Sequence, residues 1–356
     1  MTHRFLASIG VLAAVIAVVS LAPVPLAAQA PTGHPNAAAA SGTPGAAAKT
    51  TAAAKTTQWR TPWGDPDLQG AWTNATTTPL QRPAKYAGRE RLTAEEVAAL
   101  DKQTEIGTDK RGELGSAADV GAAYNALWWD RGRSDGRTSL IIDPPDGRIP
   151  RLTPEARKRQ DAFRRAEQTD EGGFGGGPVN GPEDLALYTR CVMRAPLPRV
   201  PTGYDNNYQI VQTPGYVAIL QEQVHETRII PLDGRPHLDR SVRQWLGDSR
   251  GRWEGDTLVV DTANFSDQTT FQGSTSNLHL IERWRRVDAD TIDYRFTVED
   301  STTWTSPWTA SINWKNLDRH GQQLYEYACH EGNYGMYGIL AGARVQEKAA
   351  EEAARK

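Results

Sequence analysis

Sulfur-containing residues are scarce in this sequence, with two cysteines and three methionines among 356 residues. The cysteines, Cys191 and Cys329, lie far apart and form no CxxC pair, so a cysteine-based zinc site is not expected. Two cysteines are the minimum for one disulfide bond, which an oxidising compartment favours. We therefore predict a Cys191–Cys329 disulfide, with two buried thiols or metal ligands as the alternatives.

Acidic residues are absent from the first 57 positions, which contain three basic residues. Residues 1–30 combine Arg4, the apolar run Phe5–Leu21 and the small-residue sequence Ala28-Gln29-Ala30, an order typical of a secretory signal peptide. An uncleaved anchor is the alternative. Residues 31–57 are mostly Ala, Thr, Gly, Pro and Ser and have too little apolar surface to fold, so we predict a disordered linker.

The chain after position 57 carries no excess of positive charge. Residues beyond position 57 include 37 basic and 43 acidic side chains, a net charge of −6. This balance argues against a nucleic-acid partner and against electrostatic binding to a membrane surface. We also expect no stable membrane insertion once the signal peptide is removed. We expect a periplasmic or secreted protein with a single domain over residues 58–343 and a helical tail over 344–356; the oligomeric state is left open.

Short segments rich in β-branched and aromatic residues recur along this domain, with turn sequences such as Pro214-Gly215 and Gly255-Asp256 between them. This spacing predicts a mainly β protein, an antiparallel up-and-down barrel of lipocalin-like type with a few peripheral helices. The predicted strands are Leu68–Trp72, Ser139–Ile142, Tyr208–Thr213, Tyr216–Glu222, Thr227–Leu232, Gly251–Glu254, Thr257–Thr262, His279–Val287, Thr291–Glu299, Trp308–Lys315 and Leu324–Cys329.

Helices are predicted at three places. Thr93 and Glu96 fit a capping box that starts a helix of about ten residues. Pro154 after Thr153 is well placed at the first position of a second helix. The alanine- and glutamate-rich segment Leu340–Arg355 predicts a third.

Strict alternation in three strands predicts which side chains point into the barrel. One inward residue is charged, because Glu282 shares a face with Leu280 and Trp284. A buried carboxylate is costly unless paired, so Glu282 is either an ion-pair partner or a site residue with a raised pKa. Tyr216, Ala218, Leu220 and Glu222 also share a face, which places Glu222 at the barrel mouth. The other inward residues are Ile292, Tyr294, Phe296, Val298, Trp308, Ala310, Ile312 and Trp314.

Polar residues that follow two strands are the best candidates for chemistry. Glu222 and His225 lie in one dense cluster, and His330 follows Cys329 at the end of the last predicted strand. With Glu282, these residues are the predicted catalytic groups, and a histidine is suited to acid/base work near neutral pH. They could instead form solvated loops or bind Zn, Fe or Mn, although their spacing matches no helical metal motif. We expect no cofactor and no metal.

No G-x-S-x-G sequence supports a serine nucleophile. Tryptophan is frequent, with eleven in the chain. Most of the aromatic side chains are expected in the core, but a few lining a cavity would suit an aromatic, terpenoid or sugar-like ligand. Arg250 is usually read as part of a salt-bridged surface, and it could alternatively hold a carboxylate or sulfate group. The predicted ligand-binding residues are Trp284, Tyr294, Trp308, Arg228 and Arg250.

Seven segments together resemble an uncharacterised family of secreted bacterial proteins rich in β-structure, over about residues 59–343. The resemblance implies no particular activity and adds no catalytic residue. More weakly, Gly70-x-Trp72 on a first strand is similar to lipocalin-like barrels. The segments are PWGDPDLQGAWTN (62–74), SLIIDPPDGRIPRLTPEA (139–156), NNYQIVQTPGYVAIL (206–220), IIPLDGRPHL (229–238), WLGDSRGRWEGDTLVVDTANF (245–265), TVEDSTTWTSPWTA (297–310) and YEYACHEGNYGM (325–336).

These observations favour a barrel that binds a small, partly apolar molecule. The first alternative is an acid/base enzyme, a lyase, isomerase or hydrolase, that uses the carboxylate and histidine groups in the barrel. The second is a structural protein of the cell envelope.

Overall fold

The computed structural model describes residues 59–108, 130, 132–169, 179–320 and 323–355. The predicted signal peptide and linker lie outside these residues. The described strands are β1 (Gly70–Thr73), β2 (Ile141–Asp143), β3 (Asn207–Thr213), β4 (Tyr216–Gln221), β5 (Thr227–Pro231), β6 (Asp248–Glu254), β7 (Thr257–Ala263), β8 (His279–Arg286), β9 (Thr291–Glu299) and β10 (Trp308–Asn316).

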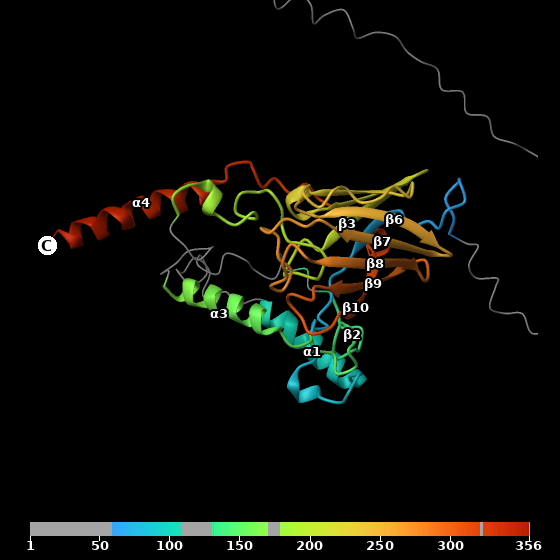
Figure 1. Cartoon of the computed structure of the whole chain (residues 1–356). Helices are drawn as coiled ribbons and strands as arrows, with labels where there is room; N and C mark the ends of the chain where they lie inside the picture. Colours follow the sequence, from blue (N-terminus) through green and yellow to red (C-terminus); the bar gives the residue numbers. More distant parts are fainter. Residues whose placement is uncertain (1–58, 109–129, 131, 170–178, 321–322, 356) are drawn as a thin grey trace, which may run out of the picture. The chain divides into compact units, whose positions relative to one another are not determined.

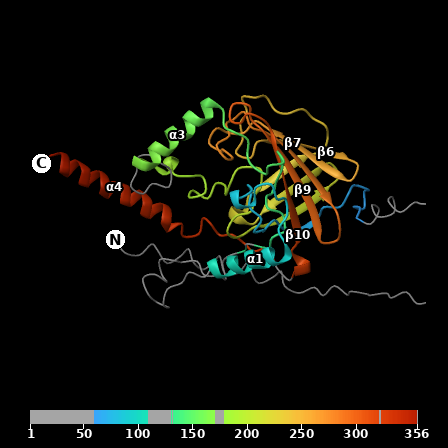
Figure 2. The ribbon, with the colours of Figure 1, turned by 90° about the horizontal axis from the view of Figure 1, so that it is seen from below.

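The strands form one antiparallel, nearly closed barrel-shaped sheet, which confirms the predicted fold class. Its hydrogen-bonded path runs β5-β4-β3-β1-β10-β9-β8-β7-β6. Figures 1 and 2 show the consecutive strands β6 to β10 side by side in the twisted sheet. Two meanders, β3–β5 and β6–β10, are therefore joined through β1, because β1 pairs with both β3 and β10. The short strand β2 pairs with the other end of β10.

Aromatic side chains fill the barrel. The alternation predicted for β8, β9 and β10 is confirmed, since the residues expected to point inward are all buried. Trp284 stacks obliquely on Tyr294 with ring centroids 4.1 Å apart, and its edge meets Trp314 at 4.7 Å. Tyr208 contacts Trp314 from β3 at 4.3 Å. These contacts join the two meanders into one core.

The predicted parity of β4 is wrong for the apolar positions. Val217 and Ile219 are buried, while Tyr216 on the opposite face is exposed. The error has a simple cause: both faces of YVAILQ are apolar, so alternation alone does not distinguish them. Glu222 nevertheless is buried, because it lies just beyond the end of β4 under other segments.

The predicted last strand, Leu324–Cys329, is also wrong. This segment is irregular and β10 is the final strand of the sheet. It is held instead by the predicted disulfide, which is present, with the Cα atoms of Cys191 and Cys329 5.7 Å apart. Tyr325 also donates its backbone N–H to Glu222.

The three predicted helices are confirmed as α1 (Ala94–Thr108), α3 (Pro154–Thr169) and α4 (Tyr334–Ala354). The capping box is formed: Glu96 N–H donates to Thr93 Oγ1 at 3.2 Å, and Thr93 N–H donates to Glu96 Oε2 at 2.8 Å. Helix α1 has 15 residues, more than predicted, and α4 begins six residues early because Asn333 caps it.

Candidate functional site

The barrel closes where β5 meets β6, the two ends of the hydrogen-bonded path. We call this place the seam. Gly251 allows the close approach, because a Cβ atom at this position would lie 2.5 Å from Leu232 Cδ2 and 2.8 Å from Ile230 Cγ2. Side-chain packing therefore replaces backbone pairing at the seam.

A buried ion pair crosses the seam from the inside. Arg228 on β5 donates through Nη2 to Glu282 Oε2 on β8 at 2.5 Å. Glu282 is fully buried and Arg228 is 7% exposed. Tyr294 on β9 donates its hydroxyl to Glu282 Oε1 at 2.8 Å. Both carboxylate oxygens are thus satisfied, which a buried charge requires.

Two hydroxyl groups complete the surroundings of Arg228. Its Nε donates to Ser249 Oγ on β6 at 2.8 Å, and its Nη2 donates to Thr262 Oγ1 on β7 at 2.6 Å. One arginine therefore links β5 to β6, β7 and β8. Burial and the neighbouring Glu282 charge raise the pKa of Tyr294 well above its usual value, so its phenol stays protonated and donates.

An open groove lies over the seam, with a volume of about 620 Å³. We call it the seam groove. Arg228 forms part of it from the barrel side, and a loop between β5 and β6 forms the opposite part. The lining residues are Thr227, Arg228, Ile229, Arg243, Gln244, Trp245, Leu246, Gly247, Ser249 and Ser266.

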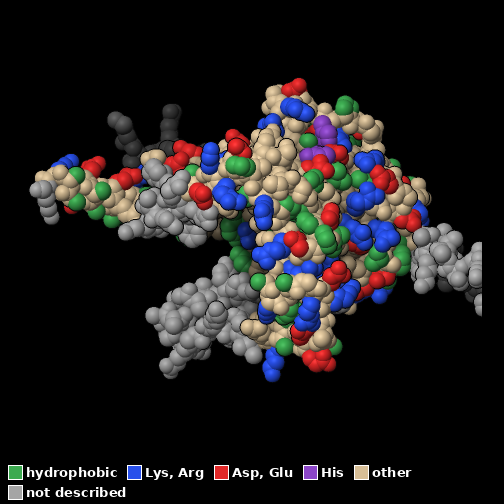
Figure 3. All heavy atoms as spheres, turned by 60° about the horizontal axis from the view of Figure 1, so that its bottom comes forward, with side chains coloured by type: hydrophobic (Ala, Val, Ile, Leu, Met, Phe, Trp, Pro, Cys, Tyr) green, Lys and Arg blue, Asp and Glu red, His purple; other side chains and the backbone are tan. Residues whose placement is uncertain are grey.

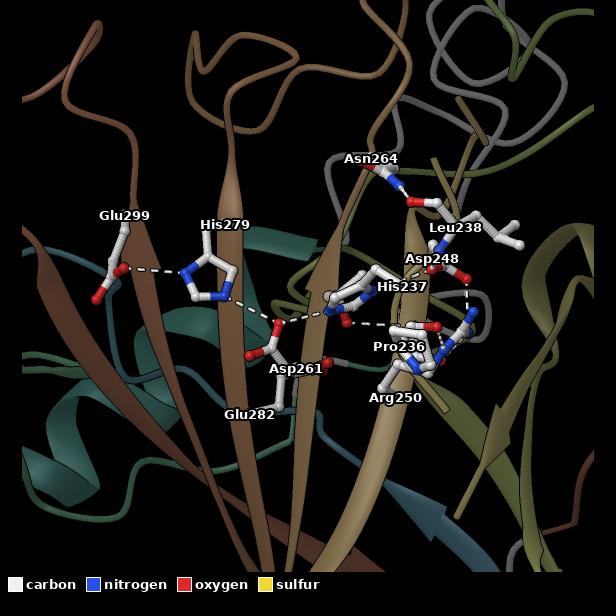
Figure 4. Close-up of polar contacts among 12 residues, drawn as sticks. Pro236, His237, Leu238, Asp248, Arg250, Asp261, Asn264, His279, Glu282 and Glu299 are labelled. Atoms are coloured by element: carbon white, nitrogen blue, oxygen red, sulfur yellow. Dashed lines mark hydrogen bonds and ion pairs between the residues drawn. The ribbon is translucent and has the colours of Figure 1, made fainter. Parts of the chain in front are cut away.

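The first half of this loop is fastened to the outer face of the sheet (Figure 4). Arg250 Nε donates to the Pro236 carbonyl at 2.9 Å. Asp248 accepts the Leu238 backbone N–H at 2.9 Å, and Asn264 donates to the Leu238 carbonyl at the same distance. The second half is tied down through Gln244, whose backbone N–H donates to the Asn264 carbonyl at 3.0 Å. The groove therefore has a fixed outer boundary.

His237 from this loop joins a row of alternating acids and histidines across β6 to β9 (Figure 4). It contacts Asp248 Oδ2 through Nδ1 and Asp261 Oδ1 through Nε2, both at 3.0 Å. His279 contacts the same Asp261 oxygen at 2.9 Å and Glu299 Oε2 at 3.0 Å. We call these five residues the histidine row. Figure 3 shows histidine side chains beside acidic ones at the surface, amid intermixed acidic and basic groups.

The geometry around His279 favours a charged imidazole. A carboxylate only accepts hydrogen bonds, so an imidazole with a carboxylate at each nitrogen donates twice only when it is doubly protonated. The hydrogen bond to Asp261, followed by that to Glu299, raises the pKa of His279 to about 9. The same contact with His279 lowers the pKa of Asp261. His279 is therefore a cation at neutral pH.

Among the four predicted catalytic residues, Glu282 and Glu222 make side-chain contacts with different partners. Glu282 is the ion-pair partner of Arg228, one of the two roles considered from the sequence. Glu222, 4% exposed, accepts from Asn207 Nδ2 at 2.7 Å and from the Tyr325 backbone at 2.5 Å. His225 lies in a short turn directly after β4. His330 is exposed and follows Cys329.

Burial raises the pKa of Glu222, and the charges of the partly buried Asp205 and Asp130 raise it further. Burial also raises the pKa of Glu226, which forms an ion pair with Arg199. The pKa of Asp205 is raised by burial and by the charge of Asp130. Carboxyl groups with raised pKa values are suited to proton transfer. Among the described residues, no three His, Cys, Asp or Glu side chains are placed to hold a metal ion.

The predicted ligand-binding residues lie in three different places. Trp284, Tyr294 and Trp308 are packed in the aromatic core, whereas Arg228 lines the seam groove. Arg250 contacts Asp248 and Pro236 and so positions the loop.

Sequence reasoning missed the loop and the histidine row. His237, Asp261 and His279 lie on different segments, and only the charged outward position of Asp261 in an otherwise apolar strand could have drawn attention. No helix in the described part of the chain is long and apolar enough to cross a membrane. A scan against models of known protein families and searches of curated proteins and of solved structures returned no match.

Proposed function

We propose that the protein is a periplasmic or secreted barrel that binds a small, partly apolar molecule in the seam groove. The observation that carries the proposal is Arg228, a nearly buried arginine that the surrounding side chains hold rigidly and that still lines an open groove. Binding sites typically combine apolar surface with a few fixed polar groups. Here Ile229, Trp245 and Leu246 supply the apolar surface.

The proposed binding site is the seam groove and not a cavity in the barrel interior. Aromatic rings occupy the interior, so the groove on the outside of the seam is the better candidate. Ile229 is 56% exposed and Trp245 is 38% exposed, which leaves apolar surface for a ligand to cover. The Cys191–Cys329 disulfide supports the periplasmic or secreted location.

Native mass spectrometry of the protein purified from its own compartment tests this proposal. We expect a small molecule to co-purify with the wild type. Thr227→Trp places a large ring in the groove at an exposed strand position and should abolish co-purification. Thr213→Trp is the matched control, since Thr213 is also exposed on a strand but lies outside the groove. Equal loading of all three proteins would contradict the proposal.

An acid/base enzyme remains the second proposal, and a structural envelope protein the third. The enzyme is favoured by Glu222, whose pKa is raised by burial and by the neighbouring charges of Asp205 and Asp130. A general acid needs such a raised pKa to hold its proton near neutral pH. Conversion of the co-purified molecule by the wild type, lost in Glu222→Gln, would support the enzyme. Release of the molecule unchanged by both proteins would argue against it.

A further inference from the structure

The seam groove contains positive charge without negative charge. Its lining includes Arg228 and Arg243, and no aspartate or glutamate. Two serine hydroxyl groups, Ser249 and Ser266, lie beside them. A groove of this composition attracts a ligand that carries negative charge.

Arg228 offers a fixed edge to such a ligand. The guanidinium group has five N–H donors in a planar fork. The bonds to Ser249, Thr262 and Glu282 use Nε and Nη2. None of the bonds formed within the described part of the chain uses Nη1, so two donors remain on the residue that lines the groove. Glu282 neutralises the charge of Arg228, so this edge contributes direction more than net charge.

Arg243 supplies the net charge. Its Nη1 donates to the Ser276 carbonyl at 2.7 Å and to the Phe265 carbonyl at 3.5 Å. Both acceptors are neutral, so these bonds position the guanidinium without balancing its charge. Arg243 is exposed, which leaves it free to meet a ligand.

Three acids adjoin the lining residues in the sequence. Asp267, next to Ser266, is exposed and lies outside the groove lining, and the other two are paired elsewhere. Asp248, next to Ser249, is held by Arg250 and His237 on the outer face. Glu226, next to Thr227, is paired with Arg199. Neither carboxylate belongs to the groove lining.

We propose that the seam groove binds the carboxylate or sulfate group of a small, partly apolar anion, with Arg243 supplying charge and the Arg228 edge supplying direction. The oxygens of a carboxylate or sulfate group can accept charge-assisted hydrogen bonds from Arg228 Nη1 and from Arg243. The apolar part of the ligand would lie against Trp245 and Ile229, which are partly exposed. This inference rests on the proposed ligand-binding function and names the class of ligand.

A matched pair of probes tests the inference. The anion 2-naphthoate and the neutral 2-naphthamide have the same ring system, and isothermal titration calorimetry measures the affinity of each for the full-length secreted protein. We expect the wild type to bind 2-naphthoate about tenfold more tightly, since hydrogen bonds to charged groups are the stronger ones. The preference should weaken at high salt, because exposed charges are screened.

Substitutions in the loop between β5 and β6 test which arginine supplies the positive charge. Arg243→Gln should remove most of the preference for 2-naphthoate and leave the affinity for 2-naphthamide unchanged, and Arg243→Lys should keep the preference. Arg240→Gln is the matched control, because Arg240 is an exposed arginine of the same loop outside the groove. Melting temperatures of the variants show whether each protein is folded.

Three results would overturn the inference in distinguishable ways. Equal affinity for the two probes, or a preference for 2-naphthamide, would exclude anion recognition and leave the binding groove in place. Failure of both probes to bind the wild type would count against the anion and the proposed groove together. A preference that survives in Arg243→Gln but disappears in Arg240→Gln would place the anion elsewhere on the loop.

Discussion

Arg228 and Glu282 are the residues on which the closure of the barrel depends. Each neutralises the charge of the other, with Glu282 fully buried and Arg228 nearly so, and Tyr294 donates a hydrogen bond to the second carboxylate oxygen. A buried pair adds little stability over an apolar pair of the same size, whereas the loss of one partner is costly. The pair is therefore best understood as fixing how β5 meets β8.

Replacement of Glu282 by leucine tests this role. Arg228 would then be buried without a counter-charge, and Glu282→Leu should lower the free energy of unfolding by about 3–5 kcal/mol. The double variant Arg228→Met with Glu282→Leu should lose clearly less than the sum of the two single variants, because neither charge is left alone. Urea unfolding measures all three. A loss below about 1 kcal/mol for Glu282→Leu would contradict the role.

The titration of His279 should make the free energy of unfolding depend on pH. Its pKa is raised from 6.5 to about 9 in the folded protein, so the folded state binds the proton more tightly. The resulting stabilisation is complete below about pH 6.5 and is lost as the pH rises through 9. We expect a loss of about 1 kcal/mol over this window, a modest value because the partly exposed pair is screened by water.

Thermal unfolding between pH 6 and pH 10 measures this loss. His279→Gln carries no titrating group at this position, so its stability should vary less over the window than that of the wild type. An equal decline in the two proteins would show that His279 is not the group responsible.

The side chain of Glu282 illustrates what could be predicted at the residue scale. Alternation placed it inside the barrel, because a strand turns every second residue to the same face. Its partner Arg228 lies 54 residues earlier, and no local pattern encodes which strands meet when a sheet closes. For the same reason the sequence offered several candidate roles for these residues and the structure selected the ion pair.

The loop between β5 and β6 is the element that relates the histidine row to the groove. Its first half contains His237, which the row holds, and its second half lines the groove through Trp245 and Leu246. Because only a few residues separate the two halves of this loop, a displacement of the half with His237 would also displace the half that lines the groove. The row therefore contributes to keeping the groove formed.

Hydrogen exchange tests the connection. His237→Gln removes the paired contacts to Asp248 and Asp261, and amide exchange over residues 236–246 should become about tenfold faster. Ser241→Ala is the control, because Ser241 contacts only Asp239 of its own loop. Unchanged exchange in His237→Gln would show that the other loop contacts suffice.

The disulfide fixes a second element, the irregular segment after β10. Cys191 and Cys329 are separated by 138 positions, and closing so long a loop stabilises the folded state by about 4–5 kcal/mol in the chain-entropy model. The double variant Cys191→Ser with Cys329→Ser should lose about 2–5 kcal/mol in urea unfolding. Its circular dichroism should retain the β signal, since the barrel core lies elsewhere. A variant as stable as the wild type would show that the segment is held by other contacts.

This segment also shows why one strand was mispredicted. Leu324–Cys329 alternates in the manner of a strand, but alternation indicates a strand only when a neighbour offers backbone partners. Both edges of β10 are already occupied, by β9 on one side and by β1 and β2 on the other. The helices were easier to predict, because a capping box such as Thr93 and Glu96 is a local signal.

At the scale of the whole molecule, we propose that the barrel serves as a scaffold and the seam as the binding site. Aromatic side chains fill the interior, and no backbone ladder joins β5 and β6, the two ends of the described path, which leaves a place for a groove. The class of fold followed from recurring strands and turns. The seam groove could not be predicted in this way, because it forms where the two ends of the sheet and a loop come together.

The most direct measurement of the central claim is hydrogen exchange of the full-length protein with and without saturating 2-naphthoate. The account predicts slower exchange in two segments that contain most of the seam groove lining, residues 227–229 and 243–249. It predicts no change at the buried Glu222 and its surroundings. Protection around Glu222 and Tyr325 instead, with the groove segments unchanged, would contradict the account.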